Sequence, residues 1–380
     1  MLYLIRNTAQ KGEIMGKLEK MLKERNLPDA LILNNGERVR SALDFAKRRE
    51  EIKEILAENE YGVIPEKPEK MTVETVSRDE VFCAGKAPLE MLSFTFEAED
   101  GVKYSFPVAA VVPKSKKKLP AFVHINFRDS VPDKYMLSEE IADRGFAVFS
   151  FCYKDVAEDS MDFKSGIAPF LGGGRRKKNS PGKIAMWAWA AMRVMDYIET
   201  REDIDLDNVA VVGHSRLGKT ALVAGGYDER FKYIISNDSG CSGAAISRGK
   251  GGESVERINS VFPFWFSRRY NETANDFESV GFDQNFLLTL SVPRHIMIGS
   301  AEKDLWADPE SEFLNLCTTK EAYAIFGKKG LIHKGRIPKA KEYLGDGDAL
   351  YHIRHGEHYF SREDWNAYMD FIDSKMKSKR

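Results

Sequence analysis

The chain has few cysteines and no long apolar run, and each absence excludes a class of protein. Four cysteines occur among 380 residues, and they are too widely spaced for a disulfide framework or for a Cys-x-x-Cys metal site. No segment approaches the roughly 20 consecutive apolar residues of a membrane span. We therefore expect a fold that depends on neither disulfides nor a bilayer, with no membrane partner.

An excess of charge of either sign is also absent. The 57 basic and 58 acidic residues leave a net charge of −1, and the basic runs at 114–118 and 175–178 are short enough to be solvated loops. This balance argues against nucleic acid as a partner. The apolar run at the N-terminus is too short for a signal peptide. The sequence as given therefore predicts a cytoplasmic protein, or a secreted one if a signal peptide has been removed.

One segment carries the clearest chemical signal: Val209–Thr220 reads VAVVGHSRLGKT. An apolar run ends in Gly-His-Ser and passes directly into a helix-forming stretch, as in the nucleophile elbow of α/β-hydrolases. A serine hydroxyl is a poor nucleophile at neutral pH, but a sharp turn lifts it clear of the sheet to where a histidine can take its proton. The segment therefore predicts an acyl-transfer enzyme with Ser215 as its nucleophile.

The surrounding sequence divides into two predicted domains. Residues 1–60 are charged, with apolar residues spaced by three and four, and they predict a helical wrap. A turn-rich connector then leads into a catalytic domain over 61–380, in which strands alternate with helices from about residue 119. This order predicts an α/β fold, a three-layer sandwich whose mostly parallel central sheet has helices on both faces. Active-site loops are then expected at the carboxyl ends of the strands.

Individual elements follow from apolar runs, turn dipeptides and helix caps. The dipeptide Asp100-Gly101 predicts a hairpin, and Ser361 with Asp364 resembles a capping box before a final helix. The stretch 239–290 is long for one connection and is expected to insert helices over the active site. Expected strands lie at 91–99, 102–112, 121–126, 146–153, 209–214, 233–237, 294–299 and 350–354, and expected helices at 15–22, 42–56, 184–200 and 216–226.

The base should be a histidine in a loop after the last strand, because the triad order of this fold is serine, acid, histidine. His352, His355 and His358 are the candidates. His352 falls within the strand, which commits its side chain to a sheet face, whereas His358 lies in a loop that can aim the ring at Ser215. We choose His358 as the base.

The His-x-x-His-x-x-His spacing also admits a metal site. Two of the three histidines would sit on a strand and its turn with no carboxylate at a fixed spacing, so no metal is expected.

Two carboxylates compete for the acid that holds the imidazole. Asp238 ends the strand after the elbow helix, and Asp304 follows the strand at 294–299. Either could instead cap a loop, and chemistry alone does not separate them. The oxyanion needs preorganised donors, which we assign to the backbone N–H and side chain of Arg216. A second backbone donor is expected near 126–127, although that loop lacks a His-Gly-Gly-Gly signal.

Several further motifs accompany the elbow, and they are Gly213–Lys219 (GHSRLGK), Asn237–Gly243 (NDSGCSG), Gly252–Glu253, Phe262–Phe266 (FPFWF), Val292–Arg294 and Tyr351–His358 (YHIRHGEH). Together they resemble the glucuronoyl esterases, carbohydrate esterase family fifteen, from about residue 45 to the C-terminus. The Ser-Arg-x-Gly-Lys stretch is the most specific, because ordinary lipases and esterases place a small residue two after the serine. Here that position is Leu217, with glycine one later, as in the family.

This resemblance implies an α/β-hydrolase that needs no cofactor and hydrolyses the ester joining 4-O-methyl-D-glucuronic acid of xylan to alcohols of lignin. It implies Ser215 as nucleophile, His358 as base and Arg216 as oxyanion stabiliser. The family's usual acid is a glutamate at the position of Asp238, and some bacterial members carry an acid at the position of Asp304. Aspartate is shorter than glutamate, so the side chain at 238 must lie about one methylene closer to the ring. Our interpretation leans slightly towards Asp238 as the acid.

The resemblance also implies substrate contacts. Lys219 matches a lysine that hydrogen-bonds sugar hydroxyls, and it lies one helical turn beyond Ser215, so it can face the same cleft. Trp306 matches a tryptophan near the sugar, and Glu253 resembles an acidic position that contacts the uronate. The implied partner is a carbohydrate ester containing uronic acid. Two other interpretations stay open: an acetyl-xylan esterase or general carboxylesterase, and a non-catalytic carbohydrate-binding protein on a hydrolase fold.

Overall fold

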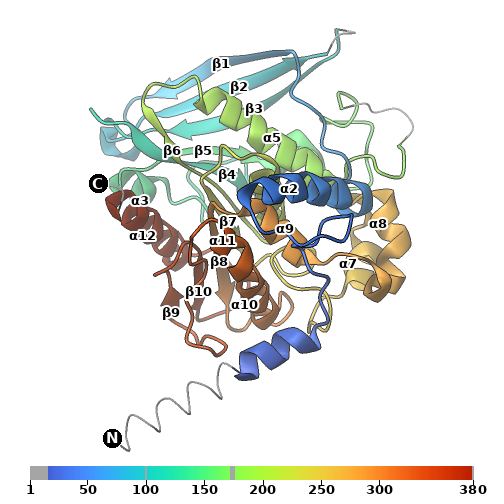
Figure 1. Ribbon diagram of the computed structural model, residues 1–380. Coiled ribbons are helices and arrows are strands. Elements are labelled where there is room, and N and C mark those ends of the chain that lie inside the picture. Colours follow the sequence, from blue (N-terminus) through green and yellow to red (C-terminus); the bar gives the residue numbers. More distant parts are fainter. Residues whose placement is uncertain (1–15, 99–100, 172–175, 379–380) are drawn as a thin grey trace, which may run out of the picture.

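A ten-stranded sheet organises the protein. The computed structural model describes residues 16–98, 101–171 and 176–378. Within them the strand order is β1-β2-β3-β5-β4-β6-β7-β8-β10-β9 (Figure 1). The strands are β1 (Lys70–Asp79), β2 (Leu89–Glu97), β3 (Lys103–Val111), β4 (Leu119–Asn126), β5 (Ala147–Cys152), β6 (Ile204–His214), β7 (Tyr233–Asn237), β8 (His295–Ala301), β9 (Glu342–Leu344) and β10 (Leu350–Arg354).

The sheet is mixed, with a parallel centre and antiparallel edges. The neighbouring strands β5, β4, β6, β7, β8 and β10 run parallel, whereas β1, β2 and β3 at one edge and β9 at the other pair antiparallel. Central strands are buried on both faces, as parallel sheets require; in β4, Phe122 belongs to one apolar cluster and Val123 to the other. The predicted α/β architecture is confirmed, and its edges make the sheet mixed.

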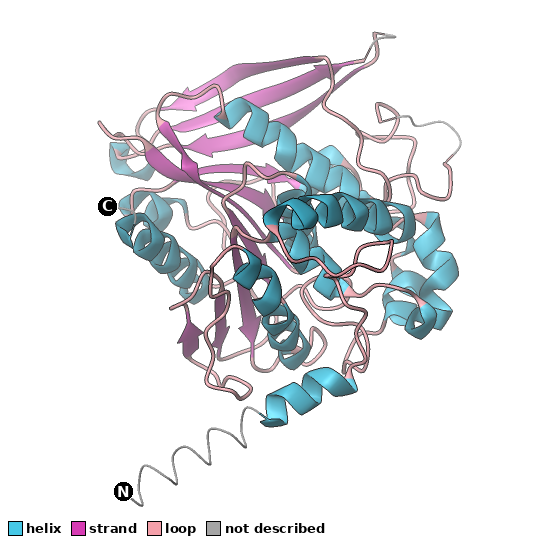
Figure 2. Cartoon of the chain, in the orientation of Figure 1, coloured by secondary structure: helices cyan, strands magenta, loops and turns pink. Residues whose placement is uncertain are grey.

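Helices cover both faces of the sheet and complete a three-layer sandwich (Figure 2). The larger apolar cluster joins the sheet to α5, α6, α9 and α10, and the smaller one joins it to α3 and α12. No helix among the described residues is both long and apolar enough to cross a bilayer. The α-helices are α2 (Ala42–Leu56), α3 (Ser138–Asp143), α4 (Tyr153–Val156), α5 (Lys183–Ile198), α6 (Arg216–Tyr227), α7 (Val255–Val261), α8 (Arg268–Thr273), α9 (Gln284–Ser291), α10 (Pro309–Thr318), α11 (Lys320–Ile325) and α12 (Arg362–Ser378).

Most predicted elements are found at their expected positions. β7 and β10 have the predicted bounds. The capping box is confirmed, because the backbone N–H of Ser361 donates to Asp364 Oδ2 (2.8 Å) and that of Asp364 donates to Ser361 Oγ (3.3 Å). β2 and β3 pair antiparallel as predicted for a hairpin, although Asp100 of the turn dipeptide and Arg175 of the second basic run lie outside the described residues. β1 and β9 escape prediction, because β1 is an edge strand with no buried side chain and β9 is very short.

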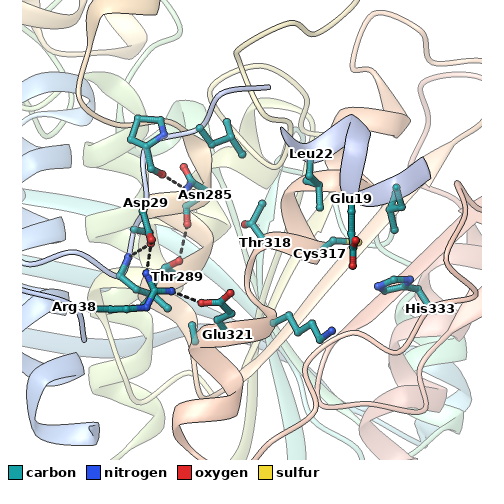
Figure 3. A pocket seen from close by; sticks show the side chains of 17 residues that line it. Glu19, Leu22, Asp29, Arg38, Asn285, Thr289, Cys317, Thr318, Glu321 and His333 are labelled. Carbon is teal, nitrogen blue, oxygen red and sulfur yellow. Dashed lines mark hydrogen bonds and ion pairs between the residues drawn. The ribbon is translucent and has the colours of Figure 1, made fainter. Parts of the chain in front are cut away.

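The described part of the N-terminal segment contains two helices joined by turns and coil, and it packs against helices of the main body. Residues 16–24 form one helix and α2 forms another, whereas 1–15 lie outside the described part. The amide Nδ2 of Asn285 in α9 donates to the Pro28 carbonyl (2.8 Å). A cavity of about 460 Å³ lies between this segment and α9 to α11, and Leu22 points towards α10 across it (Figure 3).

The stretch 239–290 contains the extra helices that the sequence predicts. α7 and α8 lie in it together with two 3₁₀ turns, η3 (Pro263–Trp265) and η4 (Ala274–Ser279), and α9 begins near its end. Glu253, Phe262 and Trp265 of this stretch line the same cleft as Ser215. The insertion therefore forms one wall of the candidate site.

A buried carboxyl group, Glu60, lies in the short π-helix η1 (Ala57–Tyr61) that follows α2. Its two oxygens accept hydrogen bonds of 2.9 and 3.0 Å from Gln284 Nε2. Burial raises the pKa of Glu60 to about 8, with a smaller contribution from the nearby Asp283 carboxylate, although the hydrogen bonds of Gln284 and Tyr61 act in the opposite direction. At neutral pH the group is therefore protonated in the folded protein and charged in the unfolded chain.

The substitution Glu60→Gln is expected to stabilise the protein relative to the wild type in alkaline solution. A carboxyl group whose pKa rises from 4.5 to about 8 on folding stabilises the fold fully below the lower value, and this contribution is lost as the pH rises through the higher one. The loss amounts to about 1.4 kcal/mol per pH unit within that window, and glutamine removes it. Urea unfolding of both proteins at acidic and alkaline pH measures the difference, and a difference that stays constant with pH would contradict the assignment.

Candidate active site

Ser215 lies in a strained turn between β6 and α6. Its backbone angles, φ 58° and ψ −128°, belong to a region that non-glycine residues rarely adopt. The turn is tight enough to exclude side chains beside it. A Cβ at Gly213 would lie 2.1 Å from the Leu217 carbonyl oxygen, and one at Gly218 would lie 3.0 Å from Ser236 Oγ. The two glycines therefore allow the close backbone approach that lifts Ser215 to the end of the sheet.

His358 lies in the loop after β10 and is paired with a carboxylate. Its Nδ1 is 2.6 Å from Asp304 Oδ2, and Asp304 sits in the turn after β8, where its N–H donates to the Ala301 carbonyl (3.1 Å). Burial alone would raise the pKa of Asp304, but the hydrogen bond and charge of His358 outweigh it and hold the pKa below its usual range. A charged carboxylate can only accept, so Nδ1 carries the proton and Nε2 is left as an acceptor.

The predicted site residues converge on one cleft of about 350 Å³ at the carboxyl ends of the central strands. Within the described residues the Ser215 hydroxyl has no hydrogen-bond partner, which leaves it free for His358; such contacts often tighten only when substrate is bound. All of the predicted residues line the cleft, namely Ser215, Arg216, Lys219, Asp238, Glu253, Asp304, Trp306 and His358.

The slight preference for Asp238 as the partner of His358 is corrected by the structure, which pairs the ring with Asp304. Asp238 is fully committed elsewhere: Oδ1 accepts from the N–H of Ala301 (2.7 Å) and Oδ2 from the guanidinium of Arg354 (3.1 Å). Burial, with the neighbouring carboxylates, raises the pKa of Asp238 well above its usual range.

Among the described residues, one group of side chains could hold a metal ion. It consists of oxygens of Asp238 and Asp304 and a ring nitrogen of His358, all within 4.8 Å of one another.

The three clustered histidines do not converge on a common point. A metal site built on the His-x-x-His-x-x-His spacing would need their ring nitrogens to face one ion. Each ring instead lies beside a different carboxylate: His352 Nε2 is 3.1 Å from Asp364 Oδ1, His355 contacts Glu302, and His358 contacts Asp304.

The side chain of Arg216 is held on both sides. Its Nη1 donates to Asp159 Oδ2, and its guanidinium lies 4.6 Å from the ring centroid of Trp265 and 5.5 Å from that of Phe262. Asp159 also accepts from Trp265 Nε1 (2.7 Å) and from the hydroxyl of Tyr153 (3.1 Å). Asp159 does not itself line the cleft, so it fixes the direction of the Arg216 guanidinium from behind.

The loop expected to supply a second oxyanion donor lies outside the cleft lining. Neither Asn126 nor Phe127 lines the cleft. Asn126 Nδ2 donates to Asp133 Oδ2 (2.7 Å), and the ring of Phe127 lies 5.8 Å from the guanidinium of Arg216. The ring of Phe127 thus packs beside Arg216, and the backbone donor of this loop stays a prediction.

The predicted sugar contacts supply a cation, an anion and an aromatic face. Lys219 is buried, and its Nζ donates to the Ser239 carbonyl. Burial lowers the pKa of Lys219, although the carboxylate of Glu253 acts in the opposite direction. Glu253 is also buried, whereas Trp306 is 55% exposed. The cleft therefore has a polar floor and an open aromatic rim.

Comparisons with known proteins identify the family. A family model described as glucuronyl esterase, fungi, matches residues 97–327. The chain belongs to the glucuronoyl esterases. This esterase is 31% identical to a carbohydrate esterase named MZ0003, from an unknown prokaryotic organism, over 94% of this chain and 91% of that protein. It is 27% identical to a 4-O-methyl-glucuronoyl methylesterase of Podospora anserina over 72% of this chain and 54% of that protein.

A solved glucuronoyl esterase from Solibacter usitatus is similar in structure to this esterase. The TM-score is 0.84 and the identity 32%, over 92% of this chain and 97% of that chain. The resemblance inferred from the sequence motifs is confirmed, and with it the α/β-hydrolase fold.

Sequence reasoning left two residues of the site without a role. Asp159 lies in a polar loop that carries no motif, so no sequence signal points to it. His214 stands beside Ser215 in the elbow motif, and its ring centroid lies 4.4 Å from that of His358. Its Nδ1 is 2.7 Å from Asn237 Oδ1, and burial lowers its pKa to about 3. A neutral ring therefore packs against the imidazole of His358.

Proposed function

We propose that this chain is a serine esterase that hydrolyses esters of D-glucuronic acid, with Ser215 as nucleophile, His358 as general base and Asp304 as the acid. The observation that carries the proposal is the 2.6 Å contact between His358 Nδ1 and Asp304 Oδ2, in the same cleft as the strained elbow of Ser215. A hydroxyl, an imidazole and a carboxylate with these surroundings support acyl transfer.

The proposed reaction follows from the proton positions. Nε2 of His358 accepts the Ser215 proton as the hydroxyl oxygen attacks the ester carbonyl. Negative charge develops on the carbonyl oxygen, and the backbone N–H and guanidinium of Arg216 are the donors that we assign to it. The C–O bond to the alcohol then breaks, and the alcohol leaves with the proton held by His358. Water repeats these steps on the acyl-enzyme and releases the uronic acid.

A uronate ester suits the polar floor of the cleft. In such an ester the acyl group is the sugar itself, so side chains that bind its hydroxyls also hold the carbonyl against Ser215. Lys219 and Glu253 offer a donor and an acceptor, and Trp306 offers an apolar face to the sugar C–H groups. The relative named 4-O-methyl-glucuronoyl methylesterase supports this assignment. We propose lignin–glucuronoxylan esters as the natural class, because the alcohol only leaves and can vary.

Two esters of one alcohol test the substrate class. We expect kcat/KM for benzyl D-glucuronate to exceed that for benzyl acetate by at least about 10²-fold, because acetate leaves the buried polar groups of Lys219 and Glu253 without partners. The shared benzyl alcohol makes the leaving group equal in both reactions. A preference for benzyl acetate would indicate an acetylesterase or general carboxylesterase, and no turnover of either ester would indicate a carbohydrate-binding protein.

A further inference from the structure

A buried arginine, Arg354, donates hydrogen bonds to the backbone of the loop that carries His358. Arg354 is the last residue of β10 and is 4% exposed, whereas most of the loop after it is exposed. Every second carbonyl of this loop accepts a hydrogen bond from its guanidinium. Nη1 donates to the carbonyl of His355 (3.1 Å), and Nη2 donates to those of Glu357 (3.1 Å) and Tyr359.

Two buried carboxylates also accept hydrogen bonds from this guanidinium. Nε of Arg354 donates to Asp364 Oδ2 (2.8 Å), and Nη2 donates to Asp238 Oδ2 (3.1 Å). Asp364 belongs to the first turn of α12 and Asp238 follows β7. The planar fork of arginine can reach carbonyls and carboxylates at once, which the single ammonium of lysine cannot do.

Asp238 also connects this arginine to the turn that carries Asp304. Its other oxygen accepts from the N–H of Ala301 (2.7 Å), the residue whose carbonyl accepts from the N–H of Asp304 (3.1 Å). The same turn meets the histidine loop directly, since the N–H of Lys303 donates to the Gly356 carbonyl (3.0 Å). One carboxylate therefore ties together the two segments that carry the imidazole and its acid.

We propose that Arg354 and Asp238 form a buried anchor that sets the position of the His358 loop against the Asp304 turn. This inference rests on the proposed function, because it gives both residues a positioning role that acts through His358. It also gives Asp238 a task other than that of triad acid. A displaced imidazole lowers the rate of proton transfer while sugar binding at Lys219 is left unchanged.

The substitution Arg354→Lys tests the anchor. We expect kcat for benzyl D-glucuronate to fall by about 10- to 100-fold with KM within about twofold of the wild type. The rate at which a fluorophosphonate labels Ser215 should fall by the same factor, because labelling needs the same base. A purely structural role would lower the melting temperature without this division between kcat and KM.

Arg294→Lys is the matched control. Arg294 is also buried (9% exposed) and donates to the carbonyls of Gly225, Asp228, Phe231 and Leu290, but it lies just before β8, at the opposite end of that strand from Asp304. We expect this variant to lose comparable thermal stability and to keep kcat within about twofold. If both variants lose kcat in proportion to their stability, or if folded Arg354→Lys keeps wild-type kcat, the anchor is refuted.

A second pair of variants covers the case in which Arg354→Lys does not fold. In Asp238→Asn one carboxylate oxygen is kept as an amide oxygen and the other becomes an NH2 donor, so only one of the two bonds, to Ala301 or to Arg354, can persist. Asp238→Ala removes both bonds, so we expect the alanine variant to have at least about tenfold lower kcat than the asparagine variant. Equal kcat values would refute the anchor. Failure of the proposed function would show differently, as activity that survives the loss of the Ser215 hydroxyl.

Discussion

Replacement of Ser215 by alanine is expected to lower kcat for a glucuronate ester by about 10⁶-fold, the scale seen when a serine nucleophile is removed. The one other hydroxyl among the residues that line the cleft, that of Ser239, is already bonded to Ser236 Oγ (2.7 Å) and to the N–H of Ala244 (2.8 Å). It is therefore unable to take over the attack. Alanine keeps the Cβ atom and the backbone strain of Ser215, so the fold should be unchanged.

Single-turnover rates and fluorophosphonate labelling measure this effect. Intact-mass analysis should show one adduct on the wild type and none on Ser215→Ala. Ser260→Ala, on the exposed part of α7, is the matched control and should keep both activity and labelling. Hydrolysis by Ser215→Ala within tenfold of the wild type would exclude the proposed nucleophile.

Asp304→Asn is expected to have the second largest effect, a loss in kcat of about 10⁴-fold, comparable to the loss of a triad aspartate elsewhere. Asparagine carries no charge to stabilise the imidazolium and can present an N–H to His358 Nδ1, which favours the wrong tautomer. Asp238→Asn should lower kcat by less than about tenfold, because no hydrogen bond joins Asp238 to the His358 ring within the described part of the chain. The amide oxygen can also keep one of the two bonds that Asp238 accepts, from Ala301 or from Arg354.

The contrast between these two variants decides the acid. If Asp238→Asn loses more activity than Asp304→Asn, the triad must be rewritten with Asp238. The pKa of Asp304 gives a further check, since the hydrogen bond of His358 more than offsets burial and holds that pKa below 3.8. Asp304 therefore remains charged in mildly acidic buffer, and the activity ratio of the wild type to Asp304→Asn should not fall through protonation of Asp304 above about pH 5.

Local sequence was sufficient to predict the elbow and the central strands, and it led to His358 as the base that we propose. The bend at Ser215 requires glycines at fixed spacing, and the strand before it must be apolar because both faces of the central sheet are covered. His358 could be chosen because strand geometry commits His352 to a sheet face, and the structure places His352 beside Asp364 within the buried layer. These predictions depend on neighbours in the chain, which the sequence displays directly.

The identity of the triad acid, and the contacts that hold Arg216 and the His358 loop, depend on segments that are distant in the sequence. Asp238 and Asp304 follow adjacent strands and reach the same cleft, so strand order alone treats them equally. The difference comes from Arg354, whose guanidinium donates a hydrogen bond to Asp238, whereas Asp304 pairs with the ring of His358. β1 escapes prediction for a different reason: only Met71 and Val73, near its start, are partly buried, and the rest of the strand is exposed.

The contacts that hold the Arg216 side chain have a consequence for protein engineering. Asp159 joins three segments of the chain, because it contacts Arg216 after the elbow, Trp265 in the insertion and Tyr153 after β5. Shortening or grafting the loop around Asp159 would thus alter turnover even though Asp159 does not line the cleft. A library aimed at new ester specificity should diversify the rim at Trp306 and leave this remote three-way junction intact.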